Sequence, residues 1–133
     1  MEKTNLPALA IQAMKSAYAP YSGFNVGAAL LCGSGKIYTG CNIENSAFSP
    51  TVCAERVAFF KAVSEGERDF KAIAICGGKG GVMSDECPPC GVCRQVMAEF
   101  CTADFEIMIV SPEGDRTVTL GEILPSVYMM ERE

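Results

Sequence analysis

The chain has 133 residues, a length typical of one domain, and we predict that residues 1–133 form a single domain. Its formal net charge is −5, and an acidic chain repels the phosphate backbone of nucleic acid. Because it also lacks both an apolar run of the ~20 residues that span a membrane and a recognisable secretion signal, we expect a cytoplasmic protein that binds a small molecule, with neither nucleic acid nor membrane as a partner.

Hydrophobic periodicity and turn residues divide the chain into helices and strands. In chain order, the predicted elements are a helix over 6–18, strands over 26–32 and 36–41, a helix over 54–64, a strand over 70–76, a helix over 91–100, strands over 105–110 and 116–120, and a helical turn over 121–124. The glycine-rich run 77–81 is predicted as a flexible loop. This order predicts an α/β fold: a mixed sheet of about five strands, partly parallel, with helices on its faces.

Three cysteines and one glutamate carry the strongest chemical signal. Cys53 is followed two residues later by Glu55, and Cys90 and Cys93 come later at a spacing typical of metal ligands. A structural zinc site usually has four protein ligands, whereas a catalytic site leaves one position to water. The chain has no histidine that could complete the set. The pattern therefore predicts a catalytic Zn²⁺ site in which Glu55 moves a proton between water and substrate.

The predicted positions of these thiols offset part of their negative charge. Cys53 lies directly before a predicted helix, and Cys90 and Cys93 lie at the opening of the next, where helix N-termini stabilise thiolates. Three thiolates and Zn²⁺ together carry a charge of about −1, which two helix N-termini reduce by about one unit. Arg56 can donate hydrogen bonds to a thiolate sulfur, and Arg94 is a second candidate for this charge compensation.

Two other interpretations of the cysteines stay open at this point. The Cys-x-x-Cys motif of residues 90–93 also fits a redox dithiol on a thioredoxin-like scaffold, although redox chemistry has no role for Cys53 and Glu55. Alternatively, Cys87 could close a structural zinc site with four cysteines, which would remove the catalytic water. Such a protein would be a binding or structural protein rather than an enzyme.

Several motifs, in this order along the chain, resemble the cytidine deaminases, specifically the small homotetrameric class with three cysteine ligands. The matching segments are Tyr18-Ala19-Pro20-Tyr21-Ser22, Val26-Gly27-Ala28-Ala29-Leu30, Gly40-Cys41-Asn42-Ile43-Glu44-Asn45, Cys53-Ala54-Glu55-Arg56 and Pro89-Cys90-Gly91-Val92-Cys93-Arg94-Gln95-Val96. The resemblance covers nearly the whole chain. It implies a three-layer α/β/α domain with one Zn²⁺ per subunit, in a homotetramer whose sites lie near subunit interfaces. The implied reaction is hydrolytic loss of the 4-amino group of cytidine or 2′-deoxycytidine, in pyrimidine salvage.

The resemblance also implies roles for single residues. The three cysteines are the zinc ligands, and Glu55 passes a proton from water to the pyrimidine N3 and then to the leaving amine. Asn42 and Glu44 match the residues that contact the 3′-hydroxyl of the sugar. Phe24 matches the residue that packs on the pyrimidine, and Ala54 belongs to the same substrate-binding set.

The chain departs from the family pattern at three places. Cys87-Pro88 precedes the second metal motif, Phe48 stands where many relatives have tyrosine, and Tyr128 stands where the family often has a phenylalanine that covers a neighbouring subunit's site. A related deaminase acting on blasticidin-type nucleosides, guanine or tRNA adenosine is a further alternative. The acidic charge argues against tRNA, and Asn42 with Glu44 argues for a free nucleoside.

Overall fold

The computed structural model describes residues 5–84 and 86–131. Its helices and strands are, in chain order, α1 (Leu6–Met14), β1 (Phe24–Cys32), β2 (Ile37–Cys41), α2 (Ala54–Ser64), β3 (Phe70–Lys79), α3 (Gly91–Phe100), β4 (Glu106–Ile109), β5 (Arg116–Thr119) and α4 (Leu120–Ile123). Within this part of the chain, none of the helices combines the length and the hydrophobicity that crossing a lipid bilayer requires.

The five strands form one sheet in the order β2-β1-β3-β4-β5. Neighbouring strands are antiparallel, except that β3 and β4 are parallel. Two parallel strands need a crossover connection, and here that connection contains α3, which starts with the second metal motif. The predicted mixed sheet is confirmed, and the crossover of its one parallel pair contains the second metal motif.

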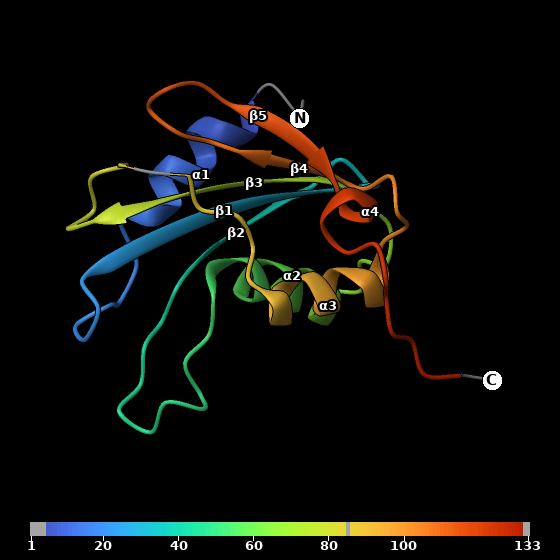
Figure 1. The fold of residues 1–133 in the computed structure, drawn as a ribbon, viewed down its shortest axis with the longest axis horizontal. Helices are drawn as coiled ribbons and strands as arrows, with labels where there is room; N and C mark the ends of the chain where they lie inside the picture. The colour runs from blue at the N-terminus through green and yellow to red at the C-terminus, as the bar shows by residue number, and fades with distance from the viewer. Residues whose placement is uncertain (1–4, 85, 132–133) are drawn as a thin grey trace.

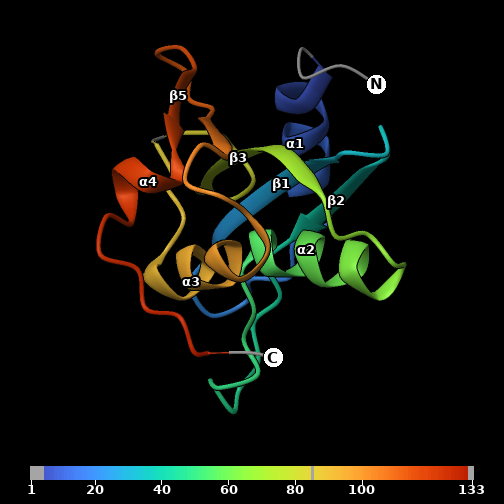
Figure 2. The same cartoon turned by 90° about the vertical axis from the view of Figure 1, so that its right-hand side faces the viewer.

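Helices cover both faces of the sheet. Along β1, Ala28 and Leu30 pack in a core shared with α2, whereas Ala29 and Leu31 pack in a second core shared with α1. This alternation follows from the two-residue period of a strand. Figure 1 shows α1 above the sheet with α2 and α3 below it, and Figure 2 shows the same layers from the side. The three-layer α/β/α fold implied by the resemblance is confirmed.

Two glycines allow the helices to lie directly on the sheet. A Cβ atom on Gly40 of β2 would lie 2.3 Å from the carbonyl oxygen of Ala54, at the start of α2. A Cβ atom on Gly27 of β1 would lie 2.1 Å from the carbonyl oxygen of Ala10, in α1 on the other face. Because Ala54 directly follows Cys53, the close approach at Gly40 sets how deep the first metal motif lies in the molecule.

Three predicted boundaries differ by two residues or more from the structure, namely the end of the first helix, the start of β1 at Phe24 and the end of β3, and long-range pairing explains them. The first helix ends at Met14 rather than at residue 18, because Tyr18 leaves the helix to pair with the segment around Ile43. Its N–H donates to the carbonyl oxygen of Asn42 at 2.9 Å, and its own carbonyl accepts from the N–H of Glu44 at 2.8 Å. The start of the glycine run is strand rather than loop, because residues 77–79 of β3 pair with residues 24–26 of β1.

Candidate metal centre and substrate pocket

Three thiols from the starts of two helices lie close together. Cys53 is the N-cap of α2, Cys90 is the N-cap of α3, and Cys93 lies in the first turn of α3. The Sγ atom of Cys90 is 3.7 Å from that of Cys53 and 3.6 Å from that of Cys93. Among the described residues these cysteines form the one group of three or more potential metal ligands, with their sulfur atoms all within 4.8 Å of one another.

The sulfur cluster fits a zinc ion. Tetrahedral zinc with Zn–S bonds of about 2.3 Å places two sulfur ligands roughly 3.8 Å apart, close to the two separations that the thiols have. A redox dithiol would need only the pair from α3, whereas here a third thiol completes one face of a tetrahedron. The fourth coordination position of such an ion is left for a molecule from outside the protein, as in catalytic zinc sites.

Arg56 supplies positive charge to the cluster. Its Nη2 donates a hydrogen bond to Cys53 Sγ at 3.4 Å. Hydrogen bonds with Cys93, Arg56 and Cys90 lower the pKa of Cys53 to about 5, although burial acts to raise it. A lowered pKa favours the thiolate, which is the form that binds metal. Arg56 Nε is buried and has no hydrogen-bond partner among the described residues, so the hydrogen bond from Nη2 to the Cys53 sulfur is the main polar contact of this guanidinium group.

Arg94 has different partners from those that the sequence suggested. Its Nε donates to the carbonyl oxygen of Pro89 at 2.9 Å, and its Nη1 donates to the carbonyl oxygen of Ile123 at 2.9 Å. Successive side chains of a helix point about 100° apart, so the residue after the buried Cys93 turns away from the sulfur atoms. Arg94 thus ties the segment before Cys90 to the end of α4 instead of bonding to a thiolate.

Glu55 lies beside the cluster without joining the group of potential ligands. It is only 3% exposed, and burial raises its pKa to about 7. A carboxyl group with a pKa near neutrality can both accept and return a proton at physiological pH. Ala54, which the resemblance places in the substrate-binding set, is fully buried, with its side chain in the core under α2.

A pocket of about 230 Å³ opens beside the sulfur cluster. Its lining brings together residues from four separate segments, among them Phe24, Asn42, Glu44, Cys53, Glu55 and Cys90. A small concave site with apolar walls and a few polar groups is typical of a site for a small molecule. Residues of both metal motifs and of the segment after β2 therefore meet in one site.

Asn42 and Glu44 occupy the same wall of this pocket. The side-chain Oδ1 of Asn42 accepts from the N–H of Val26 at 2.8 Å, and its Nδ2 donates to the carbonyl oxygen of Phe24 at 2.9 Å. These bonds hold the start of β1, and with it the Phe24 side chain, against the segment after β2. The amide still has one lone pair and one hydrogen with which to bind a ligand.

Cys87 lines the pocket but lies outside the sulfur cluster. Burial raises the pKa of its thiol to about 12. A Cβ atom on Gly77 would lie 3.1 Å from Cys87 Sγ and 3.0 Å from Cε2 of Phe24. The small size of Gly77 therefore allows the thiol and the ring to form one wall, a feature that no sequence motif predicted.

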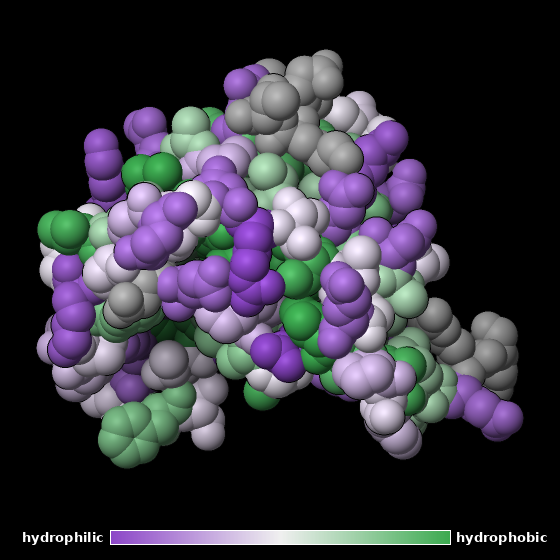
Figure 3. Space-filling model, turned by 45° about the horizontal axis from the view of Figure 1, so that its top comes forward, coloured by the Kyte–Doolittle hydropathy of each residue, from purple (hydrophilic) through white to green (hydrophobic). Residues whose placement is uncertain are grey.

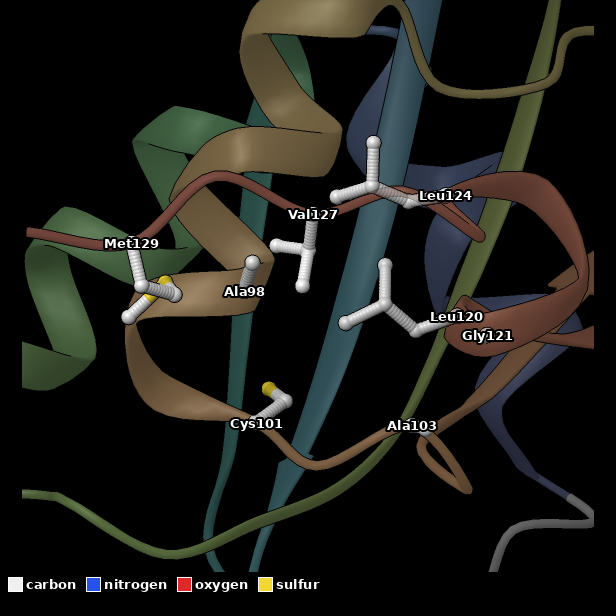
Figure 4. A pocket seen from close by; sticks show the side chains of 8 residues that line it. All are labelled: Ala98, Cys101, Ala103, Leu120, Gly121, Leu124, Val127 and Met129. Carbon is white, nitrogen blue, oxygen red and sulfur yellow. The ribbon is translucent and has the colours of Figure 1, made fainter.

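A second pocket of about 230 Å³ lies between α3, α4 and the segment that follows α4 (Figure 4). The side chains that face one another across it include Leu120, Leu124, Val127 and Met129. Its one sulfhydryl belongs to Cys101, whose pKa is raised to about 12 by burial. Among the described residues that line this pocket, none has a carboxylate, amide or cationic side chain, so this lining offers no such group for proton transfer.

Comparisons with known proteins agree with this site. Residues 1–109 match the family model described as the cytidine and deoxycytidylate deaminase zinc-binding region. The chain is 49% identical over 132 residues to a cytidine deaminase of Sporosarcina psychrophila, covering 98% of this chain and 94% of that protein. It is also 32% identical over 111 residues to a blasticidin-S deaminase of Bacillus cereus, covering 78% of this chain and 76% of that protein.

Solved structures show the same similarity. The crystal structure of cytidine deaminase from Burkholderia pseudomallei superposes with a TM-score of 0.87 at 39% sequence identity, covering 96% of this chain and 100% of that chain. The crystal structure of cytidine deaminase from Mycobacterium tuberculosis superposes with a TM-score of 0.79 at 36% identity, covering 98% of this chain and 99% of that chain. The likeness therefore extends over nearly the whole chain.

Proposed function

This chain belongs to the cytidine deaminase family, and from that premise we propose that its pocket hydrolyses the 4-amino group of cytidine and 2′-deoxycytidine. The products are uridine or 2′-deoxyuridine and ammonia. The observation that carries this proposal is that one pocket is lined by the buried Glu55 and by Cys53 and Cys90 of the three-thiol cluster. The pocket supplies a metal site, a group that transfers protons and polar groups for a sugar.

Cys53, Cys90 and Cys93 would hold the single zinc ion of the subunit. Bound there, Zn²⁺ supplies acidity to a water molecule, which can then attack a substrate near neutral pH. Arg56 offsets part of the negative charge of the thiolates through its hydrogen bond to Cys53. The N-termini of α2 and α3 contribute further positive potential at the same place.

Glu55 carries the protons of the reaction. Its carboxylate accepts a proton from the attacking water and donates it to N3 of the pyrimidine, while the water oxygen bonds to C4. A second proton from the water then passes through the same carboxyl group to the amino nitrogen, which leaves as ammonia. Burial brings the pKa of Glu55 close to neutrality, which suits a group that must take up and release protons in turn.

The remaining pocket residues bind the nucleoside. We assign Asn42 and Glu44 to the 3′-hydroxyl of the sugar, where an amide and a carboxylate can pair with it. Phe24 is assigned to the face of the pyrimidine. Since both ribose and deoxyribose have a 3′-hydroxyl, these contacts would accept cytidine and 2′-deoxycytidine alike.

We also propose a homotetramer that acts in the cytoplasm in pyrimidine salvage. Phe60 on α2 and Val92 on α3 are 49% and 58% exposed, so the outer side of this layer has apolar side chains that a neighbouring subunit could cover. By contrast, the side of the molecule seen in Figure 3 is largely hydrophilic with small apolar patches. A reducing compartment such as the cytoplasm would keep the thiols available for the metal.

The activity is tested on the purified protein with a panel of substrates. Absorbance measurements would follow cytidine, 2′-deoxycytidine, blasticidin S and guanine, and adenosine deamination in tRNA would be assayed separately. We expect zinc-dependent turnover of the two cytosine nucleosides. Turnover restricted to one of the other compounds would overturn the proposed function. Light scattering on the same sample reports the oligomeric state.

Replacing Cys87 with serine is expected to leave zinc content near one ion per chain, because this thiol lies outside the sulfur cluster. The activity on cytidine should change by less than about three-fold. A serine hydroxyl in place of the thiol alters hydrogen bonding in the pocket by well under about 1 kcal/mol, which corresponds to a change of that size. The matched control is Cys90→Ser, which removes a ligand and should release the metal. Loss of zinc from the Cys87 variant would instead support a closed, four-cysteine structural site.

A further inference from the structure

Ser22 joins two residues of the substrate pocket through one hydroxyl group. Its Oγ donates a hydrogen bond to Oε2 of Glu44 and accepts one from the backbone N–H of Phe24 at 3.0 Å. A hydroxyl group has one hydrogen to donate and two lone pairs that accept, so both bonds can exist at once. Glu44 and Phe24 both line the pocket at the sulfur cluster. Through this hydroxyl group, Ser22 therefore links the carboxylate of Glu44 to the backbone of Phe24.

The other oxygen of the Glu44 carboxylate is held by the same short segment. The backbone N–H groups of Tyr21 and Ser22 donate to Oε1 at 2.9 Å and 3.1 Å. Because both oxygens are bonded, a rotation of the carboxylate would break several hydrogen bonds together. The bond from the Ser22 side chain also lowers the pKa of Glu44, so the group stays ionised and able to accept further hydrogen bonds.

The segment that carries Ser22 is anchored to the end of β3. Lys79 Nζ donates to the carbonyl oxygen of Ser22 at 3.3 Å, and the N–H of Gly80 donates to the carbonyl oxygen of Gly23 at 2.8 Å. Ser22 thus has a defined place relative to the sheet. The hydroxyl group of Ser22, held in that place, in turn orients the carboxylate of Glu44, which lies in the segment after β2.

We propose that Ser22 is a positioning residue that sets the sugar specificity of the enzyme. Its hydroxyl orients the Glu44 carboxylate to accept a hydrogen bond from the 3′-hydroxyl of the nucleoside. The same hydroxyl fixes the position of that carboxylate relative to Phe24. This inference rests on the proposed function, in which Glu44 contacts the sugar. Ser22 itself touches no reacting atom, so its loss weakens sugar binding without altering the chemistry at C4.

The test compares two substrates that differ by the 3′-hydroxyl, 2′-deoxycytidine and 2′,3′-dideoxycytidine. For Ser22→Ala we expect kcat/KM on 2′-deoxycytidine to fall by about ten-fold, mainly through KM, which is the usual effect of losing a hydrogen bond to a charged group. On the dideoxy substrate, which has no 3′-hydroxyl, the loss should stay below two-fold. Ser22→Thr retains a hydroxyl and should recover most of the lost activity. Zinc content should be unchanged in both variants.

Equal losses of Ser22→Ala on the two substrates would overturn the inference, as would a threonine variant no better than alanine. Glu44→Gln separates this failure from a failure of the proposed sugar contact. If the Glu44 variant discriminates between the substrates and the Ser22 variant does not, the role of Ser22 alone is wrong. If the Glu44 variant shows no discrimination either, the sugar contact itself is wrong. Adding Ser22→Ala to Glu44→Gln should cause little further loss.

Discussion

Replacing Glu55 with glutamine is expected to lower kcat for cytidine by about 10²–10⁴-fold, the usual contribution of a general acid–base group. The amide has nearly the same size and shape as the carboxyl group but can neither accept the proton of water nor return it. Since Glu55 lies outside the group of potential ligands, zinc should remain bound. Steady-state kinetics and metal analysis on the same preparation measure both quantities.

The control for this experiment makes the same chemical change away from the pocket. Glu113 is exposed in the turn between β4 and β5, and Glu113→Gln should leave kcat, KM and zinc content unchanged. Turnover of the Glu55 variant within ten-fold of the parent protein would contradict the assigned proton transfer. Loss of zinc would show that the carboxyl group supports the metal site as well as the reaction.

Replacing Gly40 with alanine is expected to impair both stability and catalysis. The new methyl group would lie 2.3 Å from the carbonyl oxygen of Ala54 and 2.7 Å from the N–H nitrogen of Ala58. Backbone atoms cannot rotate out of the way, so α2 must move off the sheet, at a cost of about 1–3 kcal/mol for overpacking. A Tm lower by roughly 3–10 °C would follow for a domain of this size. Because α2 begins next to Cys53 and carries Glu55, we expect kcat and zinc affinity to fall as well.

Gly27→Ala is the matched control, because it creates the same kind of clash on the other face of the sheet. Its methyl group would lie 2.1 Å from the carbonyl oxygen of Ala10 and 2.5 Å from the backbone nitrogen of Met14, both at α1. A similar loss of Tm is expected, but the folded protein should keep its zinc affinity and most of its kcat, because α1 carries no residue of the sulfur cluster. Equal catalytic losses in the two variants would contradict the claim that Gly40 sets the depth of the metal motif. Calorimetry and competition with a chelator measure the outcomes.

The elements that hold the metal could be predicted because their signals are local. Cys53 precedes a stretch of good helix formers and Cys90 precedes a segment predicted as a helix, and the structure begins α2 and α3 at the residues directly after these cysteines. The wrong boundaries lie where distant segments pair. Tyr18 leaves its helix for a bridge to Ile43, and Gly77 enters a strand opposite Val26. No window of sequence around either residue contains its partner.

The candidate site divides in the same way. The sequence by itself determined the three thiols, the carboxyl group two residues after the first of them, and the two helix N-termini at which the thiols lie, because all of these depend on spacing along the chain. Only the tertiary structure decided that Cys87 forms a wall with Phe24 over Gly77 and that Arg94 bonds to backbone carbonyls. It also decided that one hydroxyl of Ser22 joins Glu44 to Phe24. These contacts depend on distances between segments that meet only when the sheet has formed and the helices have packed on it.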